Sequence, residues 1–234
     1  FNQFAIESAL REAFLSTAKR QSSVYAVARM LGVRLVRKSP ASVSVNLQRG
    51  DITVQKVIPK FTQFTINSKK FFNRDNIVFP AGVIAVGKAH IYDSTVPDVL
   101  LYEGEVKTKS YSSDTTQFRE IYLEENGFNV SDEDVQVKIT NVIQNVNEVW
   151  SRTRNGNAIW TADPGEKVYY DSTSGLGDTI ITFGDGSRGA VPPRGSSIDI
   201  TYAITSGSAG NFGTSNIEVK SVADGDITGS TVEI

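Results

Sequence analysis

The sequence predicts a mainly β protein with an N-terminal helical segment, an α+β chain in which two antiparallel β-rich modules stand in tandem. Three observations predict this fold class. The start of the chain carries apolar residues at helical spacing, the chain after Pro40 carries short alternating segments, and Gly, Pro, Asn and Asp separate those segments without an intervening helical pattern. The expected boundaries are 1–39 for the helical segment, 40–112 and 113–206 for the two modules, and 207–234 for an extended tail.

Two helices are expected before Pro40. In residues 23–32, apolar side chains recur every three or four positions, Ser22 or Ser23 can cap the first turn, and Gly32 stands where a helix ends. Residues 4–18 form a second candidate. Neither helix is long enough to be stable alone, so each must pack on something. The face expected to pack on the chain's own β module or on a partner helix consists of Val24, Tyr25, Ala28 and Leu31.

The strands of the first module are read from alternation and from turn residues. Val43, Val45 and Leu47 share one face of the first strand, at 42–47. Four prolines or polar clusters separate the segments that follow. The remaining expected strands are 52–57, 63–66, 77–79, 82–92 and 100–108.

The polar stretch 111–116 is the best internal boundary, and a second series of strands follows it. Its connections are again rich in Gly, Asn, Asp and Pro. After Ser206 small and polar residues dominate, so this tail is expected to continue into absent sequence or to lie against a partner. The strands expected in the second module are 119–124, 135–140, 146–150, 167–171, 179–183 and 198–205.

The composition excludes several classes of function. Hydrophobic residues at 39% and aromatic residues at 9% suffice for a core in a chain of 234 residues. Lys+Arg at 24 against Asp+Glu at 26 gives a net charge of -2, unlike the basic surface of a general nucleic-acid binder. There are no cysteines and one histidine, which excludes disulfides, thiolate catalysis and the common zinc sites. No apolar run approaches the roughly 20 residues of a membrane span. Because the chain opens at Phe1 rather than at a methionine, we expect a trimmed or processed piece.

One glycine-rich segment matches a nucleotide-binding pattern literally. Gly184-Asp-Gly-Ser-Arg-Gly189 has the spacing of the dinucleotide fingerprint and follows an expected strand, but the fingerprint requires a helix opening at its last glycine. The paired prolines Pro192 and Pro193, three and four residues later, cannot propagate such a helix. We therefore expect a tight turn with positive φ at glycines, Gly186 among them, and prolines that fix the return path. The residues expected to shape the turn are Gly184, Asp185, Gly186, Gly189, Pro192, Pro193 and Gly195.

Other chemistry-bearing residues have structural interpretations that are favoured. His90 lies in an alternating strand without a second histidine, and Asp132-Glu-Asp134 is typical of a solvated turn. Four aromatic residues could form a sugar-stacking platform, although aromatic residues in strands are usually core or interface. A basic patch could meet an acidic partner, although most such patches are solvated. Glu124 and Glu125 are further candidate catalytic carboxylates. Asp224 and Asp226 do not have the spacing of a calcium-binding loop. The aromatic residues are Trp150, Trp160, Tyr169 and Tyr170, and the basic residues are Arg29, Arg34, Arg37 and Lys38.

The glycine-rich turn belongs to a longer pattern that resembles a known family. An F-G-D-G turn at Phe183, a glycine, the pair Pro192-Pro193, an alternating strand with Tyr202, and the ending Gly207-Ser-Ala-Gly-Asn211 occur in order. This pattern resembles the signature of the baseplate J-like family, the wedge proteins of contractile phage tails and related injection machines. Residues 14–18, 22–32 and 40–45 are similar to the family's region before its first β domain. Tyr102-Glu-Gly-Glu is similar to a stretch of the larger wedge proteins.

The resemblance implies a structural role rather than catalysis. Family members form the inner ring of a tail baseplate, contact their own copies and other wedge proteins, and help convert receptor contact into sheath contraction. It implies no cofactor, metal, nucleic acid, membrane or small-molecule substrate, and places the chain in the virion tail baseplate, assembled in the cytoplasm of the bacterial host. The chain is shorter than the large wedge proteins, so we expect it to lack their extra domains. The alternatives are a carbohydrate- or receptor-binding tail module, and a hydrolase that uses His90 or a carboxylate pair.

Overall fold

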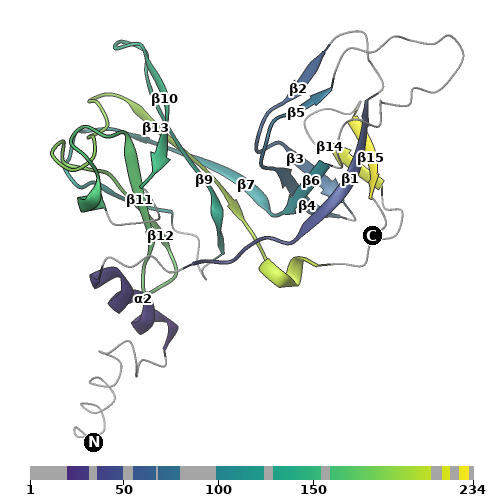
Figure 1. Cartoon of the computed structure of the whole chain (residues 1–234), viewed down its shortest axis with the longest axis horizontal. Helices are drawn as coiled ribbons and strands as arrows, with labels where there is room; N and C mark the ends of the chain where they lie inside the picture. The colour runs from purple at the N-terminus through teal and green to yellow at the C-terminus, as the bar shows by residue number, and fades with distance from the viewer. Residues whose placement is uncertain are drawn as a thin grey trace, which may run out of the picture. The chain divides into compact units, whose positions relative to one another are not determined.

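The computed structural model describes residues 20–31, 36–49, 55–66, 68–79, 99–123, 129–153, 159–211, 218–221 and 227–231. The chain divides into two compact units. Unit 1 comprises Phe1–Arg37 and Thr108–Tyr202, and unit 2 comprises Lys38–Lys107 and Ala203–Ile234. Strands dominate the described residues, with one short α-helix near the N-terminus (Figure 1). The expected mainly β fold class is confirmed.

The helix of unit 1 is α2, Gln21–Met30. Its Ala28 side chain is buried, and the helix packs against strand β11, Val168–Thr173. Every residue of β11 is buried, as expected of a strand that is covered on both faces. The helix expected at 23–32 is therefore confirmed over most of its length, while Gly32 and the candidate helix 4–18 lie outside the described residues.

Unit 2 is a closed barrel. Its described strands follow the order β1, β15, β14, β3, β4, β6 and return to β1, and each neighbouring pair is antiparallel. Phenylalanine and aliphatic side chains from alternate positions fill it, and Val43, Val45 and Leu47 are buried as their spacing predicts. A ribbon of β2 and β5 adds Ile58, Ile77 and Phe79 to the same core. The strand bounds are β1 Ser42–Arg49, β2 Lys56–Ile58, β3 Gln63–Ile66, β4 Lys69–Asn73, β5 Ile77–Phe79, β6 Val99–Glu103, β14 Glu218–Ser221 and β15 Ile227–Thr231.

A second sheet, most of it in unit 1, contains the described strands in the order β7, β13, β9, β10, β11, β12, β8. Its core includes Ile198, Ile200 and Tyr202, which alternate along β13 and are fully buried. Strands β10 and β11 pair in parallel, which departs from the expected antiparallel arrangement. The strand bounds are β7 Glu105–Ser112, β8 Glu120–Tyr122, β9 Val130–Asn141, β10 Val146–Arg152, β12 Thr179–Thr182 and β13 Ser197–Ile204.

The expected tandem order of modules is wrong, because the units are nested in the sequence. Residues 108–202 of unit 1 are inserted between the two parts of unit 2, and the N-terminal helical segment belongs to unit 1. The expected extended tail contains β14 and β15, which pair with β3 and β1 and complete the barrel. Small and polar residues gave these strands no hydrophobic alternation from which to predict them.

Two smaller differences arise within the first strand series. The single strand expected at 100–108 is two strands, β6 and β7, which meet at Gly104. Gly104 has φ 151°, and an added Cβ would lie 2.7 Å from the carbonyl oxygen of Ile204. Strand β4 was not anticipated, although its Phe71 and Phe72 are fully buried. The strand expected at 82–92, with His90, lies outside the described residues.

We predict that a chain ending at residue 211 loses the barrel. Without β14 and β15, strands β1 and β3 each lose an antiparallel partner, and two rows of backbone hydrogen bonds disappear. Hydrogen exchange should show lost amide protection in β1 and β3, with protection retained in β9 and β12 as the internal control. Unchanged protection in β1 would contradict the closed barrel.

Candidate functional site

The bend that carries the family resemblance runs from Phe183, after β12, to Ser196, before β13. Phe183 is fully buried and begins the bend inside the core of unit 1. Its ring meets that of Trp150 edge to face, with centroids 5.6 Å apart and planes at 77°. The start of the bend is therefore held by packing on β10.

Glycine is required in the bend for two different reasons. An added Cβ on Gly184 would lie 2.1 Å from the carbonyl oxygen of Arg188, so only glycine permits this approach of one backbone segment to another. Gly186, Gly189 and Gly195 have φ values of 95°, 71° and 73°, in the region that side-chain-bearing residues rarely adopt. The positive φ predicted for Gly186 is confirmed.

Asp185 stabilises the tight turn from within. Its Oδ1 accepts hydrogen bonds from the backbone N–H groups of Ser187, at 2.9 Å, and Arg188, at 2.7 Å. The N–H of Gly186 donates to the carbonyl of Gly189 at 2.9 Å. An aspartate that accepts from the backbone two and three residues later is a common way to fix a turn.

Two connections of unit 1 brace the bend from outside. In the connection between the 3₁₀ turn η2, Ile159–Thr161, and β11, the carbonyls of Asp163 and Glu166 accept from the N–H groups of Gly189 and Ala190, at 3.1 and 2.7 Å. In the connection between β7 and β8, the N–H of Phe118 donates to the carbonyl of Gly184 at 3.1 Å. The bend therefore joins segments far apart in the sequence.

The prolines and the last glycine hold the return path. The Ser113 hydroxyl donates to the carbonyl of Pro192 at 2.7 Å, and the Ser113 backbone carbonyl accepts from the N–H of Gly195 at 3.0 Å. The amide of Asn141, at the end of β9, donates to the carbonyl of Arg194 at 3.1 Å. Pro192 is buried and Pro193 half-buried. These contacts direct the chain into β13.

The geometry of the bend does not fit a phosphate. Each backbone N–H from Gly184 to Ala190 already donates to an oxygen of the chain itself. A phosphate-binding loop instead directs its N–H groups at the anion from a helix N-terminus. No helix follows Gly189 in the described part of the bend. The match to the dinucleotide fingerprint is therefore a turn.

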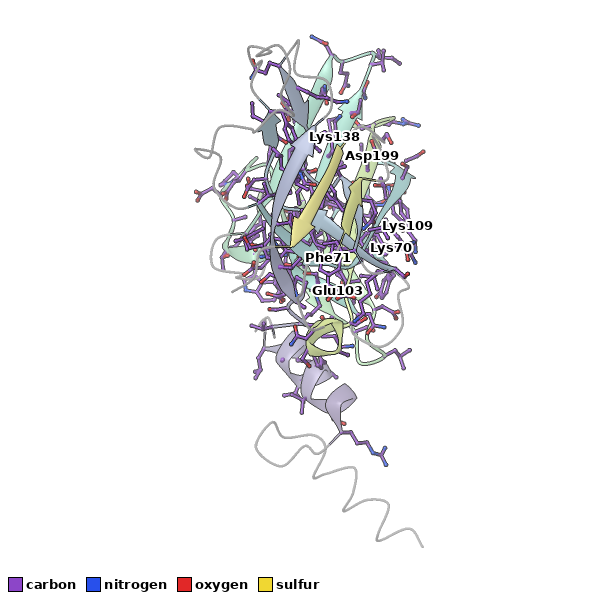
Figure 2. All side chains as sticks on the ribbon, turned by 90° about the vertical axis from the view of Figure 1, so that its right-hand side faces the viewer. Lys70, Phe71, Glu103, Lys109, Lys138 and Asp199 are labelled. Carbon is purple, nitrogen blue, oxygen red and sulfur yellow. The ribbon has the colours of Figure 1, made fainter. Side chains whose placement is uncertain are left out.

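Two stretches of the resemblance, Tyr102-Glu-Gly-Glu and the ending at 207–211, lie together in unit 2. Glu103, at the end of β6, is buried, and its Oε2 accepts from the Thr205 hydroxyl at 2.7 Å and from the Ser206 N–H at 3.0 Å. Those residues lead into the 3₁₀ turn η3, Gly207–Gly210, and an added Cβ on Gly210 would lie 2.8 Å from the Glu103 carboxylate. Figure 2 labels Glu103 and Phe71, which are register partners on β6 and β4. Glycine at 210 thus allows η3 to lie directly against a buried carboxylate.

Sequence reasoning missed a buried ion cluster in unit 1. Arg37 Nη2 lies 2.7 Å from Asp171 Oδ2, and both side chains are fully buried. Arg152 Nε lies 2.9 Å from the other oxygen of the same carboxylate. The N–H of Arg37 also donates to Asp132 Oδ1 at 2.9 Å. The cluster ties the end of the N-terminal segment to β9, β10 and β11.

Two expectations are corrected by this cluster. Arg37 was expected in a solvated basic patch, but it is buried and ion-paired. Asp132-Glu133-Asp134 was expected in a solvated turn, but it lies in β9, with Asp132 and Asp134 buried and Glu133 exposed. The Ser131 hydroxyl donates to Asp134. Charged residues in a strand carry no periodicity signal that distinguishes this burial from a turn.

Tyr169 lies beside the cluster and has a perturbed pKa. Its hydroxyl donates to the carbonyl of Val135 at 2.9 Å. Burial raises the pKa of Tyr169 to about 12, because the phenolate would be poorly solvated, and the negative charge of Asp171 acts in the same direction. The nearby Arg152 and Arg37 oppose this shift.

The structure does not bring the four candidate aromatic residues into one exposed platform. Trp150, Tyr169 and Tyr170 are buried, whereas Trp160 is 50% exposed. Tyr170 packs with Ile159 and Val168 in a small apolar cluster. Stacking on a sugar requires an open ring face, so three of the four residues cannot provide it in this fold.

Several remaining candidates lie outside the described residues. These are His90, Glu124, Glu125, Asp224, Asp226, Arg34 and the side chain of Arg29. Among the described residues, no group of three or more His, Asp or Glu side chains has the arrangement of a metal site. The described helices include none with the length and apolarity needed to cross a membrane.

The expected helix face of Val24, Tyr25, Ala28 and Leu31 is split. Ala28 is buried, while Val24 and Tyr25 are half-buried. Leu31 follows the last residue of α2 and is exposed, although its N–H still donates to the carbonyl of Val27 at 3.1 Å. Part of the face therefore packs within unit 1, and its last residue faces solvent.

No family model matches this chain, and no curated protein is similar to it. The family resemblance therefore rests on the sequence motifs alone.

We predict that Gly186→Val lowers the free energy of unfolding by about 1–2 kcal/mol through backbone strain alone, since nothing lies within 4 Å of an added Cβ. Gly184→Ala should cost more, because its Cβ would collide with two carbonyl oxygens. Ser187→Ala, at an exposed position of the same turn, is the control and should change stability by less than about 0.5 kcal/mol. Denaturant unfolding measures all three. An equal effect of the three substitutions would contradict the turn geometry.

We predict that Asp171→Ala destabilises unit 1 by about 3–5 kcal/mol, because two guanidinium groups lose their shared carboxylate. Arg37→Met should cost less, since Arg152 still pairs with Asp171. The control is Lys167→Met, which breaks the exposed pair with Glu148 and should cost at most about 1 kcal/mol. Urea unfolding of the full chain gives the order, and a larger cost for Lys167→Met than for Asp171→Ala would refute it.

We predict that Tyr169 contributes to alkaline unfolding. Its folded-state pKa of about 12 lies above the ordinary value of 10.0, so its contribution to stability is complete below pH 10 and is lost as the pH rises toward 12. The loss amounts to about 3 kcal/mol at most. Tyr169→Phe should lower stability at pH 7 by about 1 kcal/mol through the lost hydrogen bond and then show a shallower decline above pH 10. Parallel stability curves for the two proteins above pH 10 would contradict this.

Proposed function

We propose that this chain is a structural component of a contractile phage tail baseplate wedge. In this role it forms the inner ring by self-association and by contacts to other wedge proteins, and it transmits the change that triggers sheath contraction. The main support for the proposal is that the residues of the resemblance motifs make contacts within the chain itself. Gly184 allows a backbone contact that a side chain would block, and Gly210 lies directly against the Glu103 carboxylate. The backbone N–H groups of the bend bond to the chain itself.

The buried polar groups of the described residues support the same interpretation. Glu103 holds η3, and the Arg37–Asp171–Arg152 cluster holds the N-terminal segment on unit 1. Catalytic carboxylates would instead face a cleft and keep lone pairs available to a substrate. Buried, paired groups stiffen a unit, which is what a component that passes on a mechanical change requires.

The proposal places the protein in the tail baseplate, assembled in the host cytoplasm. Its partners are its own copies and other wedge proteins. Nucleic acid, membrane and small-molecule substrate have no part in it, in keeping with the nearly neutral balance of 24 basic and 26 acidic residues.

The second candidate, a carbohydrate- or receptor-binding tail module, has one observation in its favour. Trp160 is half-exposed near the bend, and Arg188 donates to its backbone carbonyl. An isolated indole is a smaller platform than a row of exposed rings. A glycan array separates the candidates: binding that is lost in Trp160→Ala would favour the module over the wedge protein.

The test of the proposed function is assembly with defined partners. The chain is co-expressed with the other tail proteins of its source, purified through a tag on a second wedge protein, and examined for stoichiometric complexes by native mass spectrometry. We expect a complex that contains multiple copies of the chain. Lys70→Gln, which changes an exposed side chain of β4, is the control variant and should assemble normally.

Two outcomes would contradict the proposal. One is a chain that remains alone when every other tail protein is present and assembled. The other is a chain that turns over a substrate by itself, which the hydrolase alternative requires.

A further inference from the structure

The N-terminal segment of unit 1 is attached through its helix and through Arg37. We call its described residues, 20–31 and 36–37, the strap. Helix α2 lies on the outside of unit 1 and packs against β11 (Figure 1). At the other end of the strap, Arg37 enters the ion cluster with Asp171. The strength of these two attachments decides whether the strap can leave unit 1.

The attachment of α2 is shallow. Of the α2 side chains that the structure describes, Ala28 alone is buried, while Val24, Tyr25 and Val27 are half-buried. Met30, the last residue of the helix, is 85% exposed. A buried methyl group contributes little hydrophobic stabilisation, and a helix of 10 residues is not stable by itself. Packing on β11 therefore holds α2 only weakly.

The socket of Arg37 leaves part of its guanidinium group without acceptors. Arg37 Nη2 lies 2.7 Å from Asp171 Oδ2. The Nε and Nη1 atoms are also buried, but neither has a hydrogen-bond partner among the described residues. A buried N–H group without a partner carries the free-energy penalty of its lost hydration. The ion pair thus favours the docked strap, and the two unpaired donors oppose it, because they regain water when Arg37 leaves.

Asp171 keeps a second cation when Arg37 leaves. Arg152 Nε lies 2.9 Å from Asp171 Oδ1, and Arg152 Nη2 donates to the carbonyl of Asp132 at 2.7 Å. Neither contact involves Arg37, so both persist without it. The main cost of breaking a buried ion pair is the charge that is left without a partner. Release of Arg37 avoids most of that cost and gives up the hydrogen bond from its N–H to Asp132 Oδ1.

The face of β11 that receives Arg37 carries further polar groups. Thr173 lies on the same face as Asp171, two residues along the strand, and is the register partner of Thr179 on β12. The hydroxyls of both threonines are buried and have no hydrogen-bond partner within the part of the chain that the structure describes. Water that enters as the strap leaves can hydrate these groups, whereas an apolar face would oppose its own exposure.

We propose that the strap is a releasable element, which docks on unit 1 through Arg37 and leaves it as one piece while the sheet of unit 1 stays folded. In the released state Arg37 is in water and Asp171 is paired with Arg152. A pull on the strap, or a partner that binds it only when released, shifts the balance toward that state. The release goes beyond the proposed function and does not depend on it, although a part that moves separately suits a protein that passes on a mechanical change.

Thiol labelling of the full chain measures the release. The chain has no cysteine, so Ala28→Cys places a single thiol that is covered while α2 is docked. Ala26→Cys, at an exposed position of the same helix, gives the rate of an open thiol, and Val137→Cys, at a fully buried position of β9, gives the rate of a closed one. We expect labelling at position 28 to be slower than at position 26 and at least about a hundredfold faster than at position 137.

The variant Arg152→Met should change the release in a distinctive direction. Without Arg152, the departure of Arg37 leaves Asp171 unpaired, so the docked state is favoured. In the Ala28→Cys background we expect labelling to slow by about tenfold or more. A substitution that merely destabilised the chain would speed labelling instead. The matched control is Lys167→Met, which removes the exposed partner of Glu148 and should leave the labelling rate at position 28 unchanged.

Native-state hydrogen exchange tests whether α2 and Arg37 leave together. The N–H of Arg37 donates to Asp132 Oδ1 in the docked state, so its exchange reports departure from the socket. We expect this amide and the amides of α2 to exchange through one opening, while the amides of β9 and β12 remain protected.

Three outcomes would overturn the release. The first is labelling at position 28 that is as slow as at position 137, because the strap would then open only when unit 1 unfolds. The second is labelling that Arg152→Met leaves unchanged or speeds. The third is an Arg37 amide that exchanges only together with β9. If circular dichroism shows that Arg152→Met does not fold, the first and third comparisons decide. Assembly with other tail proteins, which tests the proposed function, is a separate measurement.

Discussion

The close approach of backbone to backbone in the bend 184–196 is the constraint on which unit 1 depends. At Gly184 two carbonyl oxygens occupy the space of a side chain, and the N–H groups that follow are paired with the chain itself. The connections before β8 and before β11 are bonded to this bend, and β13 starts from it. Glycines that look like a ligand loop in the sequence are thus needed to bring separate segments into contact.

The same principle operates in unit 2, where Gly104 and Gly210 lie against a carbonyl oxygen and the carboxylate of Glu103. These contacts fix the point at which the chain leaves β13 and begins η3. Strands β14 and β15, from the end of the sequence, close the barrel. The chain passes between the two units three times, at 37–38, 107–108 and 202–203.

The fold class and most strands could be predicted because alternation reports a half-buried strand wherever apolar residues supply it, as in β1, β3, β5 and β13. The positive φ of Gly186 followed from the paired prolines, which exclude the helix that a nucleotide loop needs. Local sequence patterns do not show which distant segments pair. Strands β14 and β15 could not be predicted because they lack apolar alternation. The Arg37–Asp171 ion pair could not be predicted because its residues are 134 positions apart in the sequence. The exposure of Val142 and Ile143 was not predicted either, although they fall in the connection expected between the strands 135–140 and 146–150.

The described residues pair their buried carboxylates within the chain and leave Val142 and Ile143 of the β9–β10 turn exposed to solvent. The central claim is that the bend is architecture within a larger machine. A cryo-electron microscopy reconstruction of the contractile tail to which we propose this chain belongs tests it most directly. The account predicts copies of the chain in the inner ring of the baseplate, with the bend filled only by the chain's own hydrogen bonds. A particle without the chain, or density for a coordinated phosphate, sugar or ion within the bend, would contradict it.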